Sequence, residues 1–169
     1  MVKIIMIRGP PSSGKTTITK KLIKELKLDK KLDCAYISED NFRKEMQNKY
    51  KANDKKMHLQ SFELIKNTIL KILELDNYDY IFIEGLFRYQ ELLTKYEELF
   101  KEYSFSHKWI LLDADIEVLL ERDKQYRNTK SKDLLDLKKE IEQTKIKYDL
   151  KIDSSKPIDE IKKEIEQYL

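Results

Sequence analysis

The chain has 169 residues, of which 38% are charged and only six are glycine or proline (three of each), so we expect one helix-rich domain over residues 1–169. The net charge of +3 does not require a nucleic-acid partner, so binding to DNA or RNA is possible but not indicated. A single cysteine excludes an internal disulfide, and the lack of a signal-like start and of an apolar run of about 18 residues indicates a cytoplasmic protein without a membrane span.

The first predicted elements are a strand and a helix. Residues 1–7 are rich in β-branched and other apolar side chains, as expected of a buried strand. Residues 15–28 predict a helix, because apolar side chains recur at helical spacing along one face. This face is formed by Ile18, Leu22, Ile23 and Leu26.

The segment between this strand and helix fits a phosphate-binding loop. Gly9, Gly14, Lys15 and Thr16 have the spacing GxxxxGK[ST], in which backbone N–H groups surround a polyphosphate and the lysine reaches its outer phosphates. The N-terminus of the following helix adds a partial positive charge that also favours an anion. We expect the nucleotide to contact Gly9, Pro10, Pro11, Ser12, Ser13, Gly14, Lys15, Thr16 and Thr17.

Residues 34–38 predict the second strand, and polar residues follow it directly. In a parallel sheet this order places Glu39, Asp40 and Arg43 at the same crevice as Lys15. Asp40 is the candidate base, because an aspartate near the acceptor of a phosphoryl group can orient its hydroxyl and take its proton. Arg43, one helical turn later, could hold an anionic or polar part of the acceptor. The alternative for Asp40 is a helix cap.

Residues 78–84 predict the third strand, after a helix marked by an apolar stripe between residues 62 and 73. Glu84 ends this strand, and Gly85 allows another part of the chain to approach closely. Glu84 could orient water around Mg²⁺ or hydrogen-bond the acceptor, and the sequence does not choose between these roles. Arg88 follows into the crevice, although a structural salt bridge between Glu84 and Arg88 is also open.

Residues 107–113 predict the fourth strand, and Asp115 suits the N-cap of the helix that follows. This helix runs into a polar stretch without an apolar stripe, which resembles a mobile lid over about residues 122–132. Arg122 and Arg127 lie on the lid and could offset the charge that develops on a transferring phosphoryl group when the lid closes. Otherwise they are solvated residues at an exposed helix end.

Residues 148–153 predict a weaker fifth strand, and Pro157 suits the first turn of a final helix. Strands that alternate with helices predict right-handed crossovers. We therefore expect a three-layer α/β fold of the P-loop NTPase type, with about five parallel strands, helices on both faces and a short helical lid.

Arginine is scarce in this chain, with five residues among the 34 that are basic. Four of the five follow predicted strand ends, whereas Arg8, in or just after the first strand, has no assigned role. His58 and His107 are expected to be surface or packing residues, and together with Cys34 they form no metal-ligand cluster in the sequence.

The phosphate loop and the segments ISEDNFR, FIEGLF and LLDADIEVLLERDKQYR make the chain resemble the small P-loop kinases, which have the nucleoside monophosphate kinase-like fold. The resemblance covers nearly the whole chain, and three branches compete within it. Asp40 followed by Arg43 is similar to the polynucleotide kinase-like and zeta toxin-like branch. This similarity implies that Asp40 is the base and that Arg43 contacts a phosphate of the acceptor.

Two other branches share different segments. Ser38, Asp40 and Phe42, together with residues 83–85, are similar to the uridine kinase-like branch, but the chain lacks room for that branch's usual substrate-binding insertion. The segment YDLKIDSSKPIDEI is similar to the end of the chloramphenicol phosphotransferase-like branch. The resemblance implies that residues 154–157 lie near the adenine.

We therefore expect an ATP-dependent kinase that transfers the γ-phosphate to a hydroxyl of a nucleoside, nucleotide, sugar or antibiotic, with ATP and Mg²⁺ as cofactors and Thr16 as magnesium ligand. The expected catalytic residues are Lys15, Asp40, Arg122 and Arg127, and the expected acceptor-binding residues are Arg43, Glu84 and Arg88. The alternatives are a 5′-hydroxyl polynucleotide kinase and a nucleotide-binding regulatory module that is not a kinase. The sequence does not identify the acceptor, the preference for ATP or GTP, or the oligomeric state.

Overall fold

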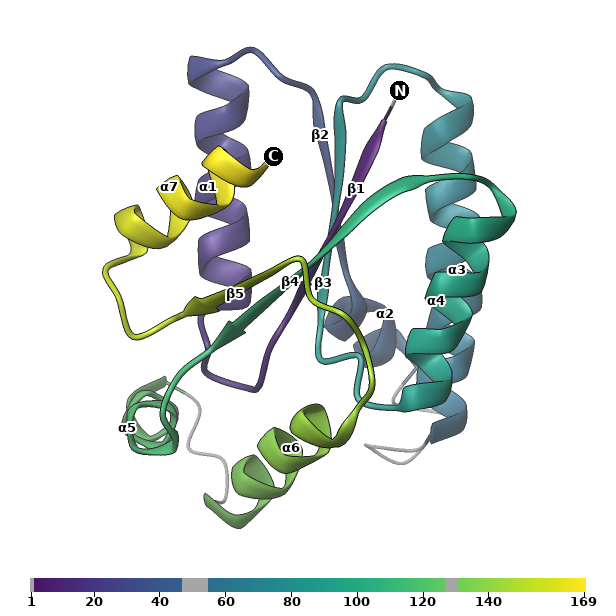
Figure 1. Cartoon of the computed structure of the whole chain (residues 1–169). Helices are drawn as coiled ribbons and strands as arrows, with labels where there is room; N and C mark the ends of the chain where they lie inside the picture. Colours follow the sequence, from purple (N-terminus) through teal and green to yellow (C-terminus); the bar gives the residue numbers. More distant parts are fainter. Residues whose placement is uncertain (1, 47–54, 127–130) are drawn as a thin grey trace.

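The structure is a computed structural model that describes residues 2–46, 55–126 and 131–169 (Figure 1). Its elements, in chain order, are β1 (Lys3–Arg8), α1 (Lys15–Asp29), β2 (Cys34–Ser38), α2 (Glu39–Glu45), α3 (Lys55–Glu74), β3 (Tyr80–Gly85), α4 (Gln90–Glu102), β4 (Ser106–Asp113), α5 (Ile116–Tyr126), α6 (Ser131–Gln143), β5 (Leu150–Asp153) and α7 (Ile158–Tyr168). The strands form one sheet in the order β2-β3-β1-β4-β5, and all neighbours are parallel. This confirms the predicted α/β fold class.

Both faces of the sheet are covered by helices, which explains why the four central residues of β1, Ile4 to Ile7, are all apolar. Successive side chains of a strand point to opposite faces. Ile4 and Met6 pack in one buried cluster with residues of α3 and α4, whereas Ile5 and Ile7 pack in a second cluster with residues of α1 and α7. Figure 1 shows these two helix pairs on opposite sides of the strands.

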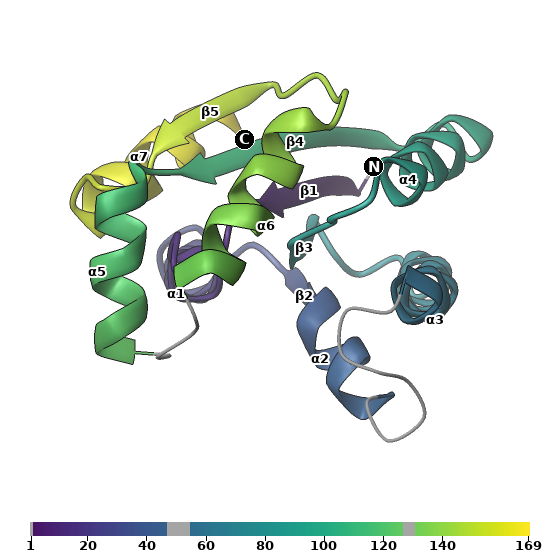
Figure 2. The ribbon, with the colours of Figure 1, turned by 90° about the horizontal axis from the view of Figure 1, so that it is seen from below.

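The remaining helices lie beyond the carboxyl ends of the strands. Figure 2 shows α2, α5 and α6 around this end of the sheet. Because all five strands are parallel, the segments that follow them converge on the same edge, where ligands of such folds bind. The fold therefore gathers polar residues from distant parts of the sequence at one end of the molecule.

Strands β3 and β5 begin later than the sequence predicts, and the residue just before each of them makes a polar side-chain contact. Asp79 accepts a hydrogen bond from the backbone N–H of Asp33 at 2.8 Å, and the ladder between β2 and β3 starts one residue further on. Asp149 likewise accepts from the backbone N–H of Trp109 at 2.8 Å, just before β5. Helix α2 is short, and Asp40 lies in its first turn rather than at its cap, which is Ser38. The cap alternative for Asp40 is thus wrong.

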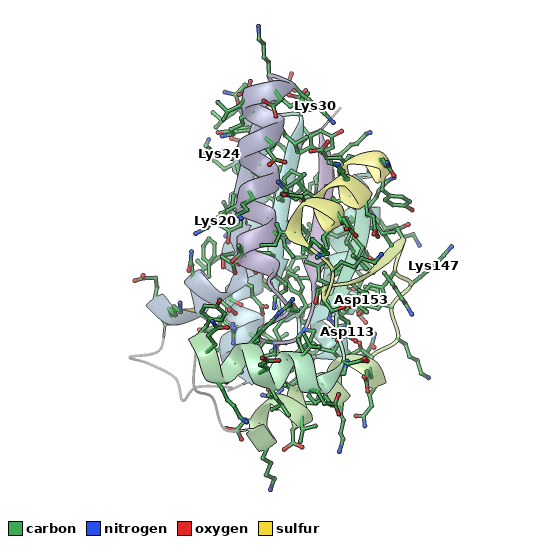
Figure 3. All side chains as sticks on the ribbon, turned by 90° about the vertical axis from the view of Figure 1, so that its left-hand side faces the viewer. Lys20, Lys24, Lys30, Asp113, Lys147 and Asp153 are labelled. Atoms are coloured by element: carbon green, nitrogen blue, oxygen red, sulfur yellow. The ribbon has the colours of Figure 1, made fainter. Side chains whose placement is uncertain are left out.

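The long helix α1 buries the face that the sequence predicts, with Ile18, Leu22, Ile23 and Leu26 all buried. Its opposite side carries Lys20 and Lys24, which are exposed and are labelled in Figure 3. In the part of the chain that is described, every helix is too short or too polar to cross a membrane.

Candidate active site

The phosphate loop connects β1 to α1 at the carboxyl end of the central strand. Gly14 is the N-cap of α1 with φ of 84°, a left-handed conformation that glycine adopts without strain. Ser12 also has a positive φ of 64°. Gly9 passes so close to β4 that an added Cβ would lie 2.1 Å from the Leu112 carbonyl oxygen. The two glycines of the motif therefore serve the curvature of the loop and its contact with the sheet.

Side chains of the loop are held by the loop itself and by its neighbours. Lys15 Nζ donates a hydrogen bond to the Pro10 carbonyl at 2.9 Å, so the lysine lies across the loop. Ser12 Oγ donates to Asp123 Oδ1 of α5 at 2.9 Å. Asp123 is buried, so this bond joins the loop to the helix that leads into the predicted lid.

Glu84, at the carboxyl end of β3, is buried beside the phosphate loop. Its Oε1 atom accepts hydrogen bonds from three hydroxyl groups, those of Thr16 at 3.1 Å, Tyr36 at 2.8 Å and Ser38 at 2.8 Å. Burial and the neighbouring Glu84 raise the pKa of Tyr36, so this phenol stays protonated and donates. The Oε2 atom of Glu84 is buried and has no hydrogen-bond partner within the described residues.

These atoms fit a magnesium ion bound to a nucleotide. Mg²⁺ keeps several waters and takes only one or two protein oxygens when it also binds phosphates. The Thr16 hydroxyl can serve as such an oxygen, and the unpartnered Oε2 of Glu84 can accept from a magnesium-bound water. A cage built from protein ligands alone is not present, because the residues that the structure describes contain no cluster of three or more His, Cys, Asp or Glu suited to a metal.

A cavity of about 450 Å³ lies over the phosphate loop. It is lined by Ser12, Ser13, Gly14, Lys15, Thr16, Thr17, Ile18, Asp40, Arg122, Tyr126, Ser154, Ile158 and Ile161. The structure thus brings Asp40 of α2 and Arg122 of α5 to the same hollow as Lys15, as the sequence leads us to expect. Arg127 and residues 128–130 of the predicted lid lie outside the described residues.

A second hollow, of about 520 Å³, lies between α6 and the ends of β4 and β5. It contains none of the predicted site residues. Asp113 and Asp153, which are in register at these strand ends and labelled in Figure 3, both line it. Lys138 of α6 donates to both carboxylate oxygens of Asp113, at 2.7 and 2.6 Å, so the charge of Asp113 is paired.

Arg43 does not line the cavity over the loop but lies beside Asp40, to which its Nη2 donates. The side chain of Asp40 is 31% exposed and that of Arg43 is 14% exposed. Arg43 Nη1 lies 3.4 Å from Nε2 of His58. His58 is fully buried, so it is not the surface residue that the sequence also allows.

Glu39 does not face the crevice, so that expectation is wrong. Its side chain points into the core, where Oε1 lies 2.9 Å from His58 Nδ1 and Oε2 accepts from the Phe87 backbone N–H at 3.0 Å. Burial opposes ionisation of this carboxyl, but the hydrogen bond with His58 and the charge of Arg43 outweigh it and lower the Glu39 pKa. An added Cβ on Gly85 would lie 2.5 Å from Glu39 Oε2, so Gly85 makes room for this carboxylate.

Arg88 points toward α6 rather than toward Glu84. Its Nε and Nη2 both donate to the Glu140 carboxylate, the latter at 2.6 Å, which is a bidentate ion pair. The salt bridge between Glu84 and Arg88 that the sequence leaves open is not formed. The pair instead ties the loop after β3 to α6, and the Arg88 side chain is only 18% exposed.

Arg8 is the residue whose role the sequence does not reveal. It is fully buried at the end of β1, and burial lowers the pKa of its guanidinium, which Tyr148 partly offsets. Its donors reach the carbonyls of Leu86 and Phe87, at 3.1 and 2.9 Å, and the hydroxyls of Thr144 and Tyr148, at 2.6 and 2.5 Å. The sequence feature that could have indicated this role is the position of Arg8 directly after an apolar run, in a chain that has few arginines.

Comparison with known proteins gives one family and a common fold. The model of a family described as an AAA domain matches residues 4–146. No curated protein sequence matches the chain. Among solved structures, the Mycobacterium tuberculosis APS kinase in complex with AMPPNP and APS is similar with a TM-score of 0.75 and 14% identity, over 98% of this chain and 95% of that chain.

Two further structures extend this likeness. The Deinococcus radiodurans tunicamycin resistance protein has a TM-score of 0.73 and 16% identity, over 99% of this chain and 95% of that chain. The Aquifex aeolicus shikimate kinase has a TM-score of 0.64 and 20% identity, over 97% of this chain and 94% of that chain. At such identities the likeness concerns the fold, which these proteins share along nearly their whole length.

Proposed function

This chain belongs to the AAA domain family, and from that premise we propose that it is an ATP-dependent kinase that transfers the γ-phosphate of ATP to a hydroxyl group of a small molecule. One observation carries the proposal: the phosphate loop, Asp40 and Arg122 line a single cavity at the carboxyl end of the sheet. Proteins of this fold include APS kinase, solved with AMPPNP and APS, and shikimate kinase. Both are named as kinases.

The phosphate side of the site would be formed by the loop and its neighbours. The backbone N–H groups of the loop and Lys15 would hold the β- and γ-phosphates, with Lys15 exchanging the Pro10 carbonyl for phosphate oxygen. Thr16 would be the direct ligand of Mg²⁺, and Glu84 would bind one of its waters. Bound Mg²⁺ would supply positive charge that offsets the negative charge of the phosphates.

In the transfer step, Asp40 would accept the proton of the acceptor hydroxyl. The acceptor hydroxyl gives its proton to the Asp40 carboxylate as its oxygen bonds to the γ-phosphorus, and the bond from that phosphorus to the β–γ bridging oxygen breaks, which leaves ADP. Arg122 faces the cavity and would offset the charge on the phosphates. We assign Arg127, from its place in the sequence, to the same task. Arg43 and Arg88 would border the acceptor, each fixed by a carboxylate.

A screen of acceptors tests this proposal. Purified protein with Mg²⁺ and γ-labelled ATP would be incubated with nucleosides, nucleotides, sugars, shikimate, APS, antibiotics and a 5′-hydroxyl oligonucleotide, and labelled products would be separated. We expect label on one class of small molecule. Label on the oligonucleotide alone would favour the polynucleotide kinase. ATP hydrolysis that no acceptor accelerates would contradict a kinase and favour a regulatory module.

The matched variants are two lysines of α1. Lys15→Ala should abolish transfer, because the lysine that reaches the outer phosphates is lost. Lys24→Ala, on the exposed side of the same helix (Figure 3), should transfer phosphate like the unaltered chain. Equal loss in both variants would indicate a general effect on the helix rather than a role of Lys15.

A further inference from the structure

A line of four side chains joins the phosphate cavity to the core. It begins at Asp40, which lines the cavity, and passes through Arg43 and His58 to Glu39. Glu39 ends the line by accepting a hydrogen bond from the Phe87 backbone N–H. Two of its members, His58 and Glu39, are fully buried and do not line the cavity, so neither can touch a ligand there.

Each contact in this line has a defined direction. A carboxylate only accepts hydrogen bonds, so the proton between Glu39 and His58 is on Nδ1, 2.9 Å from Glu39 Oε1. Nε2 of the ring then presents its lone pair, and the group that faces it at 3.4 Å is Arg43 Nη1, which can only donate. Arg43 donates its other terminal nitrogen to Asp40. At every contact from the core to the cavity, a donor therefore faces an acceptor.

The core end of the line is rigid, whereas the cavity end is on a short helix. His58 packs edge-on against Tyr89 with ring centroids 5.1 Å apart, and Glu39 lies against Gly85. Helix α2, which carries both Asp40 and Arg43, has only seven residues and buries just one of them, Glu39. Apolar packing alone therefore fixes α2 weakly, and a polar anchor is needed to place the Asp40 carboxylate precisely.

We propose that His58 and Glu39 are positioning residues, which orient Arg43 and through it hold the Asp40 carboxylate at the phosphate cavity. The role of Asp40 in this inference rests on the proposed function, but the line of contacts does not. His58 on α3 thus belongs to the site through Arg43, although it touches neither nucleotide nor acceptor. Loss of its contact with Arg43 would lower turnover without weakening ATP binding, since the phosphate loop is untouched.

A spectroscopic test requires no acceptor. The chain has two histidines, so long-range ¹H–¹⁵N spectra contain two imidazole rings, and His107 on β4 is an internal reference. We expect His58 to show a fixed tautomer protonated at Nδ1. Asp40→Asn and Arg43→Lys should each shift the His58 Nε2 resonance and leave His107 unchanged. If neither variant moves His58 Nε2, the line of contacts does not exist and the inference is wrong, whatever the protein phosphorylates.

A pair of substitutions separates positioning from support of the fold. In His58→Asn the amide nitrogen lies as many bonds from Cα as Nδ1, so the bond to Glu39 is kept and the contact with Arg43 is lost. In His58→Gln the amide oxygen can take the place of Nε2, so Arg43 keeps an acceptor and Glu39 loses its donor. We expect His58→Asn to be the more stable variant and His58→Gln to be the more active one.

The measurements are kcat, KM for ATP and the urea midpoint, with the acceptor found by the screen above. We expect His58→Asn to lower kcat by about tenfold to a hundredfold at an unchanged KM for ATP, and His58→Gln to restore most of it, because small misplacements of catalytic groups are costly. His107→Asn is the control and should match the unaltered chain. The opposite result would be a kcat that falls with the urea midpoint, so that His58→Gln is both less stable and less active than His58→Asn. It would mean that His58 only supports the fold.

Discussion

Two arginines at neighbouring strand ends show how burial decides what a residue does. Arg88 follows β3 and pairs with a partly exposed carboxylate, Glu140, while Arg8 ends β1 and is enclosed by neutral oxygens. A buried guanidinium must satisfy its donors, and Arg8 does so with two carbonyls and two hydroxyls from segments far apart in the sequence. Arg8 is therefore a structural residue next to the phosphate loop.

Arg8→Lys should destabilise the protein by about 2–4 kcal/mol, because an ammonium cannot reach the four acceptors that the planar guanidinium reaches and leaves buried oxygens without donors. Urea unfolding followed by circular dichroism measures the effect. Arg88→Lys is the matched control and should cost about 1 kcal/mol or less, since its ion pair is partly solvated. Equal effects at both positions would contradict the structural role of Arg8.

Asp40 is a residue of the opposite kind, partly exposed and at the cavity. Asp40→Asn keeps the shape of the side chain but removes its capacity to accept a proton, so turnover should fall on the order of 100-fold or more. The affinity for ATP, measured by calorimetry, should stay close to that of the unaltered chain. Full activity in this variant would show that another group acts as the base.

At the scale of elements, the segment after β3 connects several features of the site. β3 lies beside β1 and places Glu84 next to Ile7, so the carboxylate meets Thr16 of the phosphate loop. The next residue, Gly85, leaves space for the Glu39 side chain. The carbonyls of Leu86 and Phe87 then accept hydrogen bonds from Arg8. The backbone N–H of Phe87 also binds Glu39. One strand end thereby fixes groups from β1, α1 and α2.

Gly85→Ala tests this arrangement. The new Cβ would lie 2.5 Å from Glu39 Oε2 and 2.7 Å from Glu39 Cβ, so the glutamate must move and weaken its bonds to Phe87 and His58. We expect a loss of about 1–3 kcal/mol in the free energy of unfolding. Ser106→Ala, at the exposed start of β4, should change it by less than about 0.5 kcal/mol. A neutral Gly85→Ala would show that α2 can shift freely.

At the scale of the whole molecule, the cavity is built from segments that need not stay together in the unfolded chain. Residues of the phosphate loop, α2, α5 and the start of α7 line it, and Ser12 joins the loop to α5 through Asp123. A ligand that binds only this assembled cavity must stabilise the folded state. Binding of a nucleotide in this cavity would therefore raise the global stability of the protein.

ATP with Mg²⁺ at about 100 times its dissociation constant should stabilise the protein by about 2.7 kcal/mol and raise the melting temperature by roughly 5–10 °C. Differential scanning fluorimetry over a range of ATP concentrations measures this shift. Lys15→Ala should lose most of the shift, whereas Lys24→Ala should keep it. A melting temperature of the unaltered chain that ATP does not change would contradict nucleotide binding, and with it the proposed function.

The sequence by itself determined the features that depend on adjacent residues. The spacing from Gly9 to Thr16 marks the phosphate loop, and the alternation of apolar strands and amphipathic helices leads to the parallel sheet that the structure contains. Because parallel strands end at one edge, Asp40 could be assigned to the same crevice as Lys15, and the structure places both at one cavity. The roles of these residues in catalysis remain predictions.

Only the tertiary structure decided which way polar side chains point and what they meet. Glu39 and Asp40 are neighbours in sequence, yet one is buried against Gly85 and the other lines the cavity, since successive residues of α2 face different directions. The partners of Arg8 lie 78 to 140 positions away, and Arg88 meets Glu140 rather than Glu84. Such contacts depend on the register of the sheet and the packing of α2, α3 and α6 against it, which no local pattern specifies.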